Sequence, residues 1–199
     1  MQDLGSLGGN YSEAWGVSAN GAVVVGAADN AAGFRHAFRW TEVDGVMRDL
    51  GTLGGGYSWA DGVSADGAVV VGWAYNAAQQ PRAFRWTAAG GMENLNTTYA
   101  NLLTPGSALW EARAISPDGR YIVGWGYNAA TGWEAFLLDT QGCASENGDV
   151  DGNGCVDEAD LLAVLFAFGS TLGREDTNCD GVVDDADWLI VLFNFGSGC

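Results

Sequence analysis

The stretch Gly16-Val17-Ser18-Ala19-Asn20-Gly21-Ala22-Val23-Val24-Val25-Gly26 decides the fold of the first two thirds of this chain. Its Asn-Gly pair favours a tight hairpin turn with positive φ at both central residues. The β-branched run that follows the turn is typical of a buried central strand. The pattern returns over residues 62–72 and, more loosely, over residues 114–124. Three copies of one hairpin predict three copies of one β unit.

Further matches on both sides of this hairpin set the length of the repeat. Met1-Gln2-Asp3-Leu4 returns as Met47-Arg48-Asp49-Leu50 and faintly as Met92-Glu93-Asn94-Leu95. Ala37-Phe38-Arg39-Trp40 returns as Ala83-Phe84-Arg85-Trp86 and then as Ala135-Phe136-Leu137-Leu138. Repeats of this length with several strands each are typical of propeller blades or β-arrays. We therefore expect a mainly β domain of three four-stranded, propeller-like blades over residues 1–46, 47–91 and 92–140, with the repeated aromatic residues in the layers between blades.

Three blades are too few to close a propeller ring, which usually takes four to eight. An unclosed array leaves exposed strand edges and blade faces, which favour pairing. Three arrangements would cover these edges and faces: missing blades in a longer chain, ring closure by several subunits, or head-to-tail association into a fibre. We favour self-association. Met1 aligns with the internal positions Met47 and Met92, so it need not be a translation start, and the chain is open to being part of a longer protein.

These units resemble the HAF repeat of bacterial secreted proteins, named for the triplet His36-Ala37-Phe38. The second copy has Arg82 in place of the histidine, and the third has Glu134. The resemblance covers residues 1–139 and implies an exported, propeller-like protein without implying an activity. His36 is the only histidine, and it has no paired Ser or Cys nucleophile in the sequence pattern. We therefore expect a protein that is not an enzyme.

The last quarter of the chain holds two copies of an acidic twelve-residue pattern. Oxygen-bearing side chains take its first, third, fifth, ninth and twelfth places, glycine takes the sixth, and the seventh offers its backbone carbonyl. This spacing is that of an EF-hand-type calcium loop. Two copies, each followed by an apolar run, favour this interpretation over an acidic surface loop. The predicted ligands of two Ca²⁺ ions are Asp149, Asp151, Asn153, Cys155, Asp157 and Asp160, then Asp176, Asn178, Asp180, Val182, Asp184 and Asp187.

Two features of this region carry a second resemblance. Asp replaces the usual twelfth-place Glu in both loops, and Phe168-Gly169-Ser170 recurs as Phe195-Gly196-Ser197. The order loop, helix, linker, loop, helix resembles a type I dockerin domain over residues 143–199. The family implies two calcium ions and docking on a cohesin partner. Its partner-reading tenth and eleventh places, often a hydroxyl pair, hold Glu158-Ala159 and Asp185-Ala186 here, so the resemblance supports calcium binding better than cohesin recognition.

The predicted helices of this module, residues 161–168 and 188–195, are apolar on nearly every side. A helix packed on one side only should show a polar stripe opposite. We therefore expect at least one helix face, including Phe166 or Phe193, to contact a blade domain of the same chain or of another subunit. Residues 141–148 are the expected linker, and residues 149–199 the expected calcium module.

Charge and cysteine content indicate the compartment. The net charge is −17, and residues 143–199 hold 12 acidic side chains against Arg174 alone. Such acidity argues against nucleic-acid or anionic-membrane partners, and no apolar run reaches the roughly 18 residues of a membrane span. Four cysteines, Cys143, Cys155, Cys179 and Cys199, suggest disulfides and an extracellular setting rather than zinc. Of three pairings we favour Cys143 with Cys199 and Cys155 with Cys179.

The sequence as a whole predicts a non-catalytic, calcium-stabilised extracellular structural or adhesive protein, secreted or on the cell surface. Its module would dock onto a neighbouring subunit or a cohesin-like surface partner, giving a homo-oligomer or filament. The alternative is a carbohydrate-binding or tethering fragment of a larger secreted protein, in which the blades hold a glycan.

Overall fold

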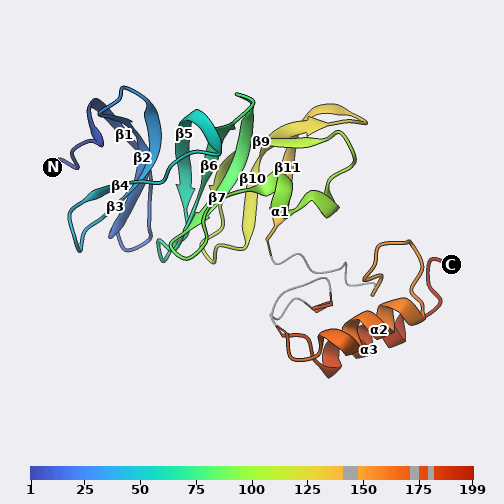
Figure 1. Ribbon diagram of the computed structural model, residues 1–199. Helices are drawn as coiled ribbons and strands as arrows, with labels where there is room; N and C mark the ends of the chain where they lie inside the picture. The colour runs from blue at the N-terminus through green and yellow to red at the C-terminus, as the bar shows by residue number, and fades with distance from the viewer. Residues whose placement is uncertain (141–147, 171–174, 179–181) are drawn as a thin grey trace. The chain divides into compact units, whose positions relative to one another are not determined.

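A computed structural model describes residues 1–140, 148–170, 175–178 and 182–199. The chain divides into two compact units, Met1–Leu138 and Asp139–Cys199, which are described separately (Figure 1). Cys143, Cys179 and Asp180, named above, lie outside the described residues.

Unit 1 consists of antiparallel sheets that follow one another along the chain (Figure 1). The first contains β1 (Gly8–Val17), β2 (Val23–Asn30), β3 (Arg35–Thr41) and β4 (Met47–Asp49) in that order. The second contains β5 (Gly54–Val63), β6 (Val69–Asn76), β7 (Pro81–Thr87) and β8 (Gly91–Asn94). After α1 (Leu95–Thr98) and a 3₁₀ turn, η1 (Ala100–Leu102), the third contains β9 (Ala108–Ile115), β10 (Tyr121–Asn128) and β11 (Gly132–Asp139). The predicted mainly β, propeller-like and unclosed architecture is confirmed, and the third sheet has three strands within the described residues.

The sheets are offset by one strand from the sequence repeats. β4 begins at Met47, where the second repeat begins, yet it pairs with β3 of the first sheet, with Met47 opposite Trp40 and Asp49 opposite Phe38. In the same way, β8 contains Met92 and completes the second sheet by pairing with β7. Each of these sheets takes its outermost strand from the first residues of the following repeat.

The hairpin turn at Asn20-Gly21 differs from the predicted primed turn. Gly21 has φ 76°, but among the described residues the only non-glycine with positive φ is Gln79. The Gly21 N–H donates to the Ser18 carbonyl at 2.9 Å, and the Ala22 N–H donates to Asn20 Oδ1 at 3.0 Å. The asparagine side chain and the backbone bond hold the turn together, and only the glycine adopts the left-handed conformation. The prediction of two positive φ angles is wrong.

Each pair of neighbouring sheets packs face to face. We call the face turned toward the following sheet the forward face, and the face turned toward the preceding sheet the backward face. Between the first two sheets, forward residues Val23, Val25 and Ala37 pack against backward residues Ala60, Val70, Ala74 and Phe84, together with Leu50 of the β4–β5 connection. Between the second and third, Val71 and Ala83 pack against Leu95, Tyr99, Leu109, Ala112, Ile122 and Leu138. The predicted burial of the β-branched strands is confirmed for the first two sheets. The predicted place of the repeated aromatic residues between blades is confirmed for Phe84, whereas Phe38 and Trp40 are buried on the backward face of the first sheet, which no other sheet of unit 1 covers.

Hydrogen bonds also join neighbouring sheets. The Ala37 N–H of the first sheet donates to Ser58 Oγ of the second at 2.8 Å. The Ala19 N–H donates to the Ala65 carbonyl at 3.0 Å, and the Ala65 N–H to the Pro117 carbonyl at 2.9 Å. These bonds fix the register of one sheet on the next, which apolar packing alone leaves open.

Unit 2 contains α2 (Glu158–Ala167) and α3 (Asp185–Phe193), so both predicted helices are confirmed, although each begins three residues earlier than predicted. Asp157 and Asp184 are the N-caps, and each takes part in a capping box with the aspartate three residues later. These caps satisfy N–H groups that would otherwise lack partners at the helix start. The core under the helices consists of Val150, Val156, Val164, Val183 and Val191.

The disulfide of unit 2 corrects the predicted pairing. Cys155 is bonded to Cys199, so neither Cys143–Cys199 nor Cys155–Cys179 can form. The Val156 N–H donates to the Ser197 carbonyl at 3.0 Å, and the Gly196 N–H donates to the Val156 carbonyl at 2.8 Å. The end of the chain thus returns along the first loop, which brings Cys199 to Cys155. Sequence spacing cannot show this return.

Among the described residues, no helix is long and apolar enough to cross a lipid bilayer.

Candidate functional site

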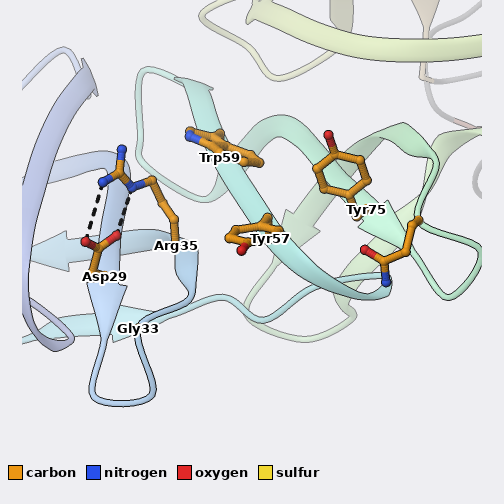
Figure 2. Close-up of a pocket in the computed structure, with 7 residues that line it drawn as sticks. Asp29, Gly33, Arg35, Tyr57, Trp59 and Tyr75 are labelled. Carbon is orange, nitrogen blue, oxygen red and sulfur yellow. Dashed lines mark hydrogen bonds and ion pairs between the residues drawn. The ribbon is translucent and has the colours of Figure 1, made fainter.

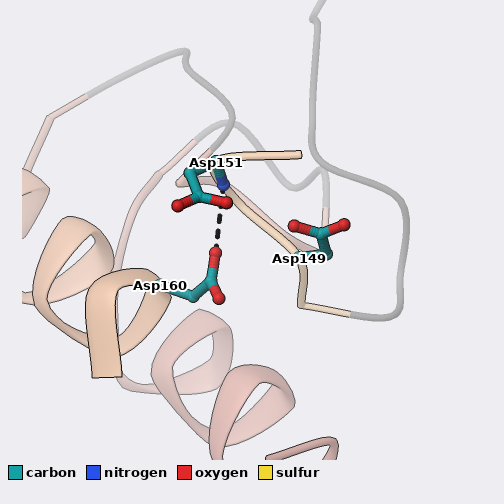
Figure 3. A group of neighbouring side chains, drawn as sticks. All are labelled: Asp149, Asp151 and Asp160. Atoms are coloured by element: carbon teal, nitrogen blue, oxygen red, sulfur yellow. Dashed lines mark hydrogen bonds between the residues drawn. The ribbon is translucent and has the colours of Figure 1, made fainter. Parts of the chain in front are cut away.

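The first acidic loop gathers three carboxylates. One oxygen from each of Asp149, Asp151 and Asp160 lies within 4.8 Å of the others (Figure 3). Asp149 and Asp151 lie at the start of the loop, while Asp160 is fully buried in the first turn of α2. The first, third and twelfth predicted ligands therefore meet, as the loop pattern requires.

Backbone N–H groups hold Asp160 in place. Its Oδ1 accepts from Val150 N at 2.7 Å and from Asp151 N at 3.0 Å, and its Oδ2 accepts from Asp157 N at 2.9 Å. A carboxylate has about four acceptor positions, so these bonds leave capacity for a cation. The loop backbone thereby orients the twelfth ligand from three sides.

The other predicted ligands with side-chain oxygens make hydrogen bonds within the loop or to the start of α2. Asn153 Oδ1 accepts from Cys155 N at 2.7 Å, and Asn153 Nδ2 donates to Asp151 Oδ2 at 3.0 Å. Asp157 accepts from Ala159 N at 2.8 Å and caps α2. The Cys155 sulfur is committed to the disulfide, which leaves oxygen donors alone. An all-oxygen set fits a hard cation such as Ca²⁺ or Mg²⁺.

The second loop repeats the buried twelfth-place aspartate. Asp187 Oδ1 accepts from Asn178 N at 2.9 Å, and Asp187 Oδ2 accepts from Asp184 N at 2.8 Å. Asp176 is also buried, whereas Asp184 caps α3 and Val182 is exposed. Because Asp180 lies outside the described residues, the full second set of predicted ligands cannot be assembled.

An aromatic cleft on unit 1 is a second candidate site. A hollow of about 660 Å³ is lined by Asp29, Gly33, Arg35, Tyr57, Trp59, Tyr75 and Gln79 (Figure 2). Trp59 stacks on Trp73 with ring centroids 4.0 Å apart and an interplanar angle of 11°. On the other wall, Arg35 Nε donates to Asp29 Oδ1 at 2.9 Å. Rigid aromatic faces beside a fixed polar pair suit a ligand with an apolar face and a hydroxyl rim.

The repeat pattern does not predict this cleft, because it places the repeated aromatic residues in layers between blades. That assignment holds for Phe84, which is buried between the first two sheets, whereas Phe38 is buried on the backward face of the first sheet. The cleft aromatics are a different set, and the signal that could have found them is the alternation Tyr57, Trp59 on one strand and Trp73, Tyr75 on the next. Alternate residues of a strand share one face.

A buried acid lies between the second and third sheets. Asp61 occupies a register shift in the β5–β6 pairing, and its side chain is 6% exposed. Burial raises the pKa of Asp61 to about 7, although Arg113, with Nη1 at 3.3 Å from Oδ2, opposes this shift. Glu111, which also pairs with Arg113, adds to the rise. We assign Asp61 a structural role at the interface between these sheets, since its ion pair with Arg113 joins β5 to β9.

His36 contacts Asp49, with Nδ1 and Oδ2 2.8 Å apart. The two residues lie on β3 and β4, and Asp49 Oδ1 also accepts from Gly51 N at 2.7 Å. The histidine thus ties the outer strand and the following turn to the sheet, which fits its place as a repeat residue.

No protein-family model matches this sequence, and no curated protein matches it significantly. Solved structures do resemble it. The putative TolB of Agrobacterium tumefaciens is 16% identical with a TM-score of 0.48, over 66% of this chain and 46% of that one. TolB from Acinetobacter baumannii is 15% identical with a TM-score of 0.45, over 62% of this chain and 29% of that one. This chain matches less than half of the length of either protein, and the resemblance concerns architecture alone.

Proposed function

We propose that this chain is a non-catalytic, extracellular structural or adhesive protein whose unit 2 binds two Ca²⁺ ions and docks onto a neighbouring subunit or a surface partner. The observation that carries the proposal is the meeting of Asp149, Asp151 and Asp160 around one point, with the buried Asp160 held by three backbone N–H groups.

Electrostatics favours a cation at this point. Two carboxylates about 4 Å apart repel by ~4 kcal/mol at an effective dielectric near 20. All three cluster residues, Asp149, Asp151 and Asp160, are carboxylates. The second loop also has aspartate at its first and twelfth places. A bound Ca²⁺ would replace this repulsion by attraction and so stabilise the folded loops, which couples metal binding to folding.

Two further observations support the location and the docking role. The Cys155–Cys199 disulfide is typical of an oxidising, extracellular compartment. In unit 2, Phe166 is 84% exposed and Phe193 is 82% exposed, at the same place on α2 and α3. Two matched aromatic side chains on one small unit supply the anchors that protein partners commonly bury.

Calorimetric titration of the full chain with Ca²⁺ tests the metal part of the proposal. We expect two ions to bind to the unaltered chain, and one site to be lost in the double variant Asp149→Asn, Asp151→Asn. Glu42→Gln, an exposed acid of unit 1, is the matched control and should leave both sites intact. Unchanged Ca²⁺ uptake by the double variant would refute the assignment.

A second candidate function rests on the aromatic cleft. There Tyr57, Trp59 and Tyr75 would stack on the apolar face of a neutral saccharide, while Arg35 and Asp29 would bond its hydroxyl groups. The net charge of −17 disfavours an acidic glycan. Titration with neutral oligosaccharides, followed by Trp fluorescence, tests this function. Trp59→Ala should abolish the signal, and Trp15→Ala, an exposed tryptophan outside the cleft, should not.

A further inference from the structure

We propose that the forward face and the β11 edge of the third sheet bind a second copy of this chain, head to tail, with residues Met1–Asp3 of that copy as the missing fourth strand. This contact would give the proposed structural protein its subunit interface, and it rests on the proposed function only for that structural role. It does not depend on calcium.

The forward face of the third sheet lacks the cover that the other two have. In the first and second sheets, Val25 and Val71 are fully buried by the next sheet. The equivalent Val123 is 41% exposed. Ala135, equivalent to the buried Ala37 and Ala83, is exposed as well. Exposed large side chains extend this patch: Tyr121, Tyr127, Trp133 and Leu137.

The first sheet carries the complementary half of the same interface. Its backward face holds Ala28, Phe38 and Trp40, packed with Leu4, Leu7, Val24 and Met47. By repeat position these residues match Ala74, Phe84, Trp86, Leu50, Leu53, Val70 and Met92, which in the second sheet pack against Val23, Val25 and Ala37. Unit 1 has no sheet before the first one, so no forward face covers these residues within unit 1. A hollow of about 320 Å³, lined in part by Leu4, Phe38 and Met47, lies on this face.

The strand edge gives the contact its register. β4 pairs with β3, with Arg48 opposite Arg39 and Met47 opposite Trp40. Met1-Gln2-Asp3 is the repeat equivalent of Met47-Arg48-Asp49 and belongs to no strand. β11 is the outer strand of the third sheet, so one edge of it is unpaired within the described residues. The same register would place Gln2 of the second copy opposite Leu137.

The chemistry of this surface selects a blade rather than a helix as its occupant. An open strand edge presents N–H and C=O groups, which another strand satisfies and a helix does not. The contact between Ala37 and Ser58 would be reproduced by Ala135 and Ser12 of the second copy. One bond would be lost, because Pro117 stands where Ala19 and Ala65 donate and has no N–H. Leu137, where the other repeats have arginine, makes the new contact more apolar.

Site-specific cross-linking of the full chain tests the register. Two singly substituted chains, Gln2→Cys and Leu137→Cys, are mixed under mild oxidation with calcium chelated. We expect a disulfide-linked heterodimer from this mixture. Gln2→Cys mixed with Val43→Cys is the matched control, since Val43 is 96% exposed but lies in the β3–β4 connection. A comparable yield from the control mixture would overturn the proposed register.

Sedimentation velocity measures the association itself. Leu137→Asp should raise the dissociation constant at least about tenfold, because it buries a charge in an apolar contact. Its circular dichroism should be unchanged, since Leu137 is 69% exposed in the single chain. A chain that stays monomeric at every concentration would overturn the inference. Association that a chelator abolishes and Leu137→Asp leaves intact would also overturn it, while supporting docking through unit 2.

Discussion

At the scale of single residues, the buried acid Asp61 should make stability depend on pH. Its pKa is raised in the fold, from 3.8 to about 7, so the folded state favours the protonated form. The stabilising contribution is complete below the unfolded pKa and is lost as the pH rises through 7. At pH 8 we expect the free energy of unfolding of Asp61→Asn, measured by urea denaturation, to exceed that of the unaltered chain by about 1–2 kcal/mol. Near pH 4 this difference should vanish. Equal pH profiles for the two chains would contradict this.

Gly72 should tolerate no side chain. A Cβ at this position would collide with the carbonyl oxygen of Trp59, and Gly26 and Gly124 meet the carbonyls of Glu13 and Glu111 in the same way. The β-bulge in each inner strand pair brings the two backbones close together at this point. Gly72→Ala should therefore cost at least about 2 kcal/mol in urea unfolding. Gly56→Ala is the control, since a Cβ there meets only Phe34 side-chain atoms at 3.5 and 3.6 Å and the backbone is not in the left-handed region.

Residue types predicted some of these contacts and not others. The Val-Val-Val runs indicated buried strands because β-branched side chains suit that environment, and the carboxylate cluster of the first acidic loop was visible because each place of the pattern is fixed along the chain. The burial of Asp61 was not visible, since it depends on Arg113 from the next repeat. The cleft around Trp59 depends in the same way on residues of two sheets.

At the scale of elements, the Cys155–Cys199 disulfide should stabilise unit 2. It joins residues separated by 44 positions. The chain-entropy estimate for a loop of this length is about 4 kcal/mol. The double variant Cys155→Ser, Cys199→Ser should lower the stability of unit 2 by up to that amount, as measured by amide hydrogen exchange of α2 and α3. The strands of unit 1 serve as the internal reference and should keep their protection.

The strand order shows what periodicity can and cannot predict. Repeats in the sequence indicated the number of units and the position of each hairpin. They did not indicate that β4 completes the preceding sheet, because a repeat has the same period wherever its boundary is drawn. The primed turn was predicted from Asn20-Gly21 alone, whereas in the structure Asn20 Oδ1 accepts from the Ala22 N–H and only Gly21 has a positive φ.

At the scale of the whole molecule, calcium should act on one unit only. The acidic cluster belongs to unit 2, and unit 1 is held by apolar layers between sheets. Differential scanning calorimetry should show two transitions, of which only that of unit 2 moves upward with added Ca²⁺. A hundredfold excess of ion over its dissociation constant corresponds to about 2.7 kcal/mol per site. A shift of both transitions together would show instead that the units unfold as one.

The offset between sheets and repeats has a consequence for how such a chain can grow or be trimmed. If a gene duplication inserts one repeat, the new segment brings the strand that finishes its predecessor and leaves its own sheet to be finished by its successor. Every added blade is thus joined to the one before it by a strand pair, and a deletion of the second repeat, residues 47–91, removes β4 to β7 and leaves residues 92–94 to take the place of β4 beside β3. A chain that ends just before Met47, by contrast, lacks β4, the outer strand of the first sheet. A chain that ends after Asp49 keeps that sheet complete.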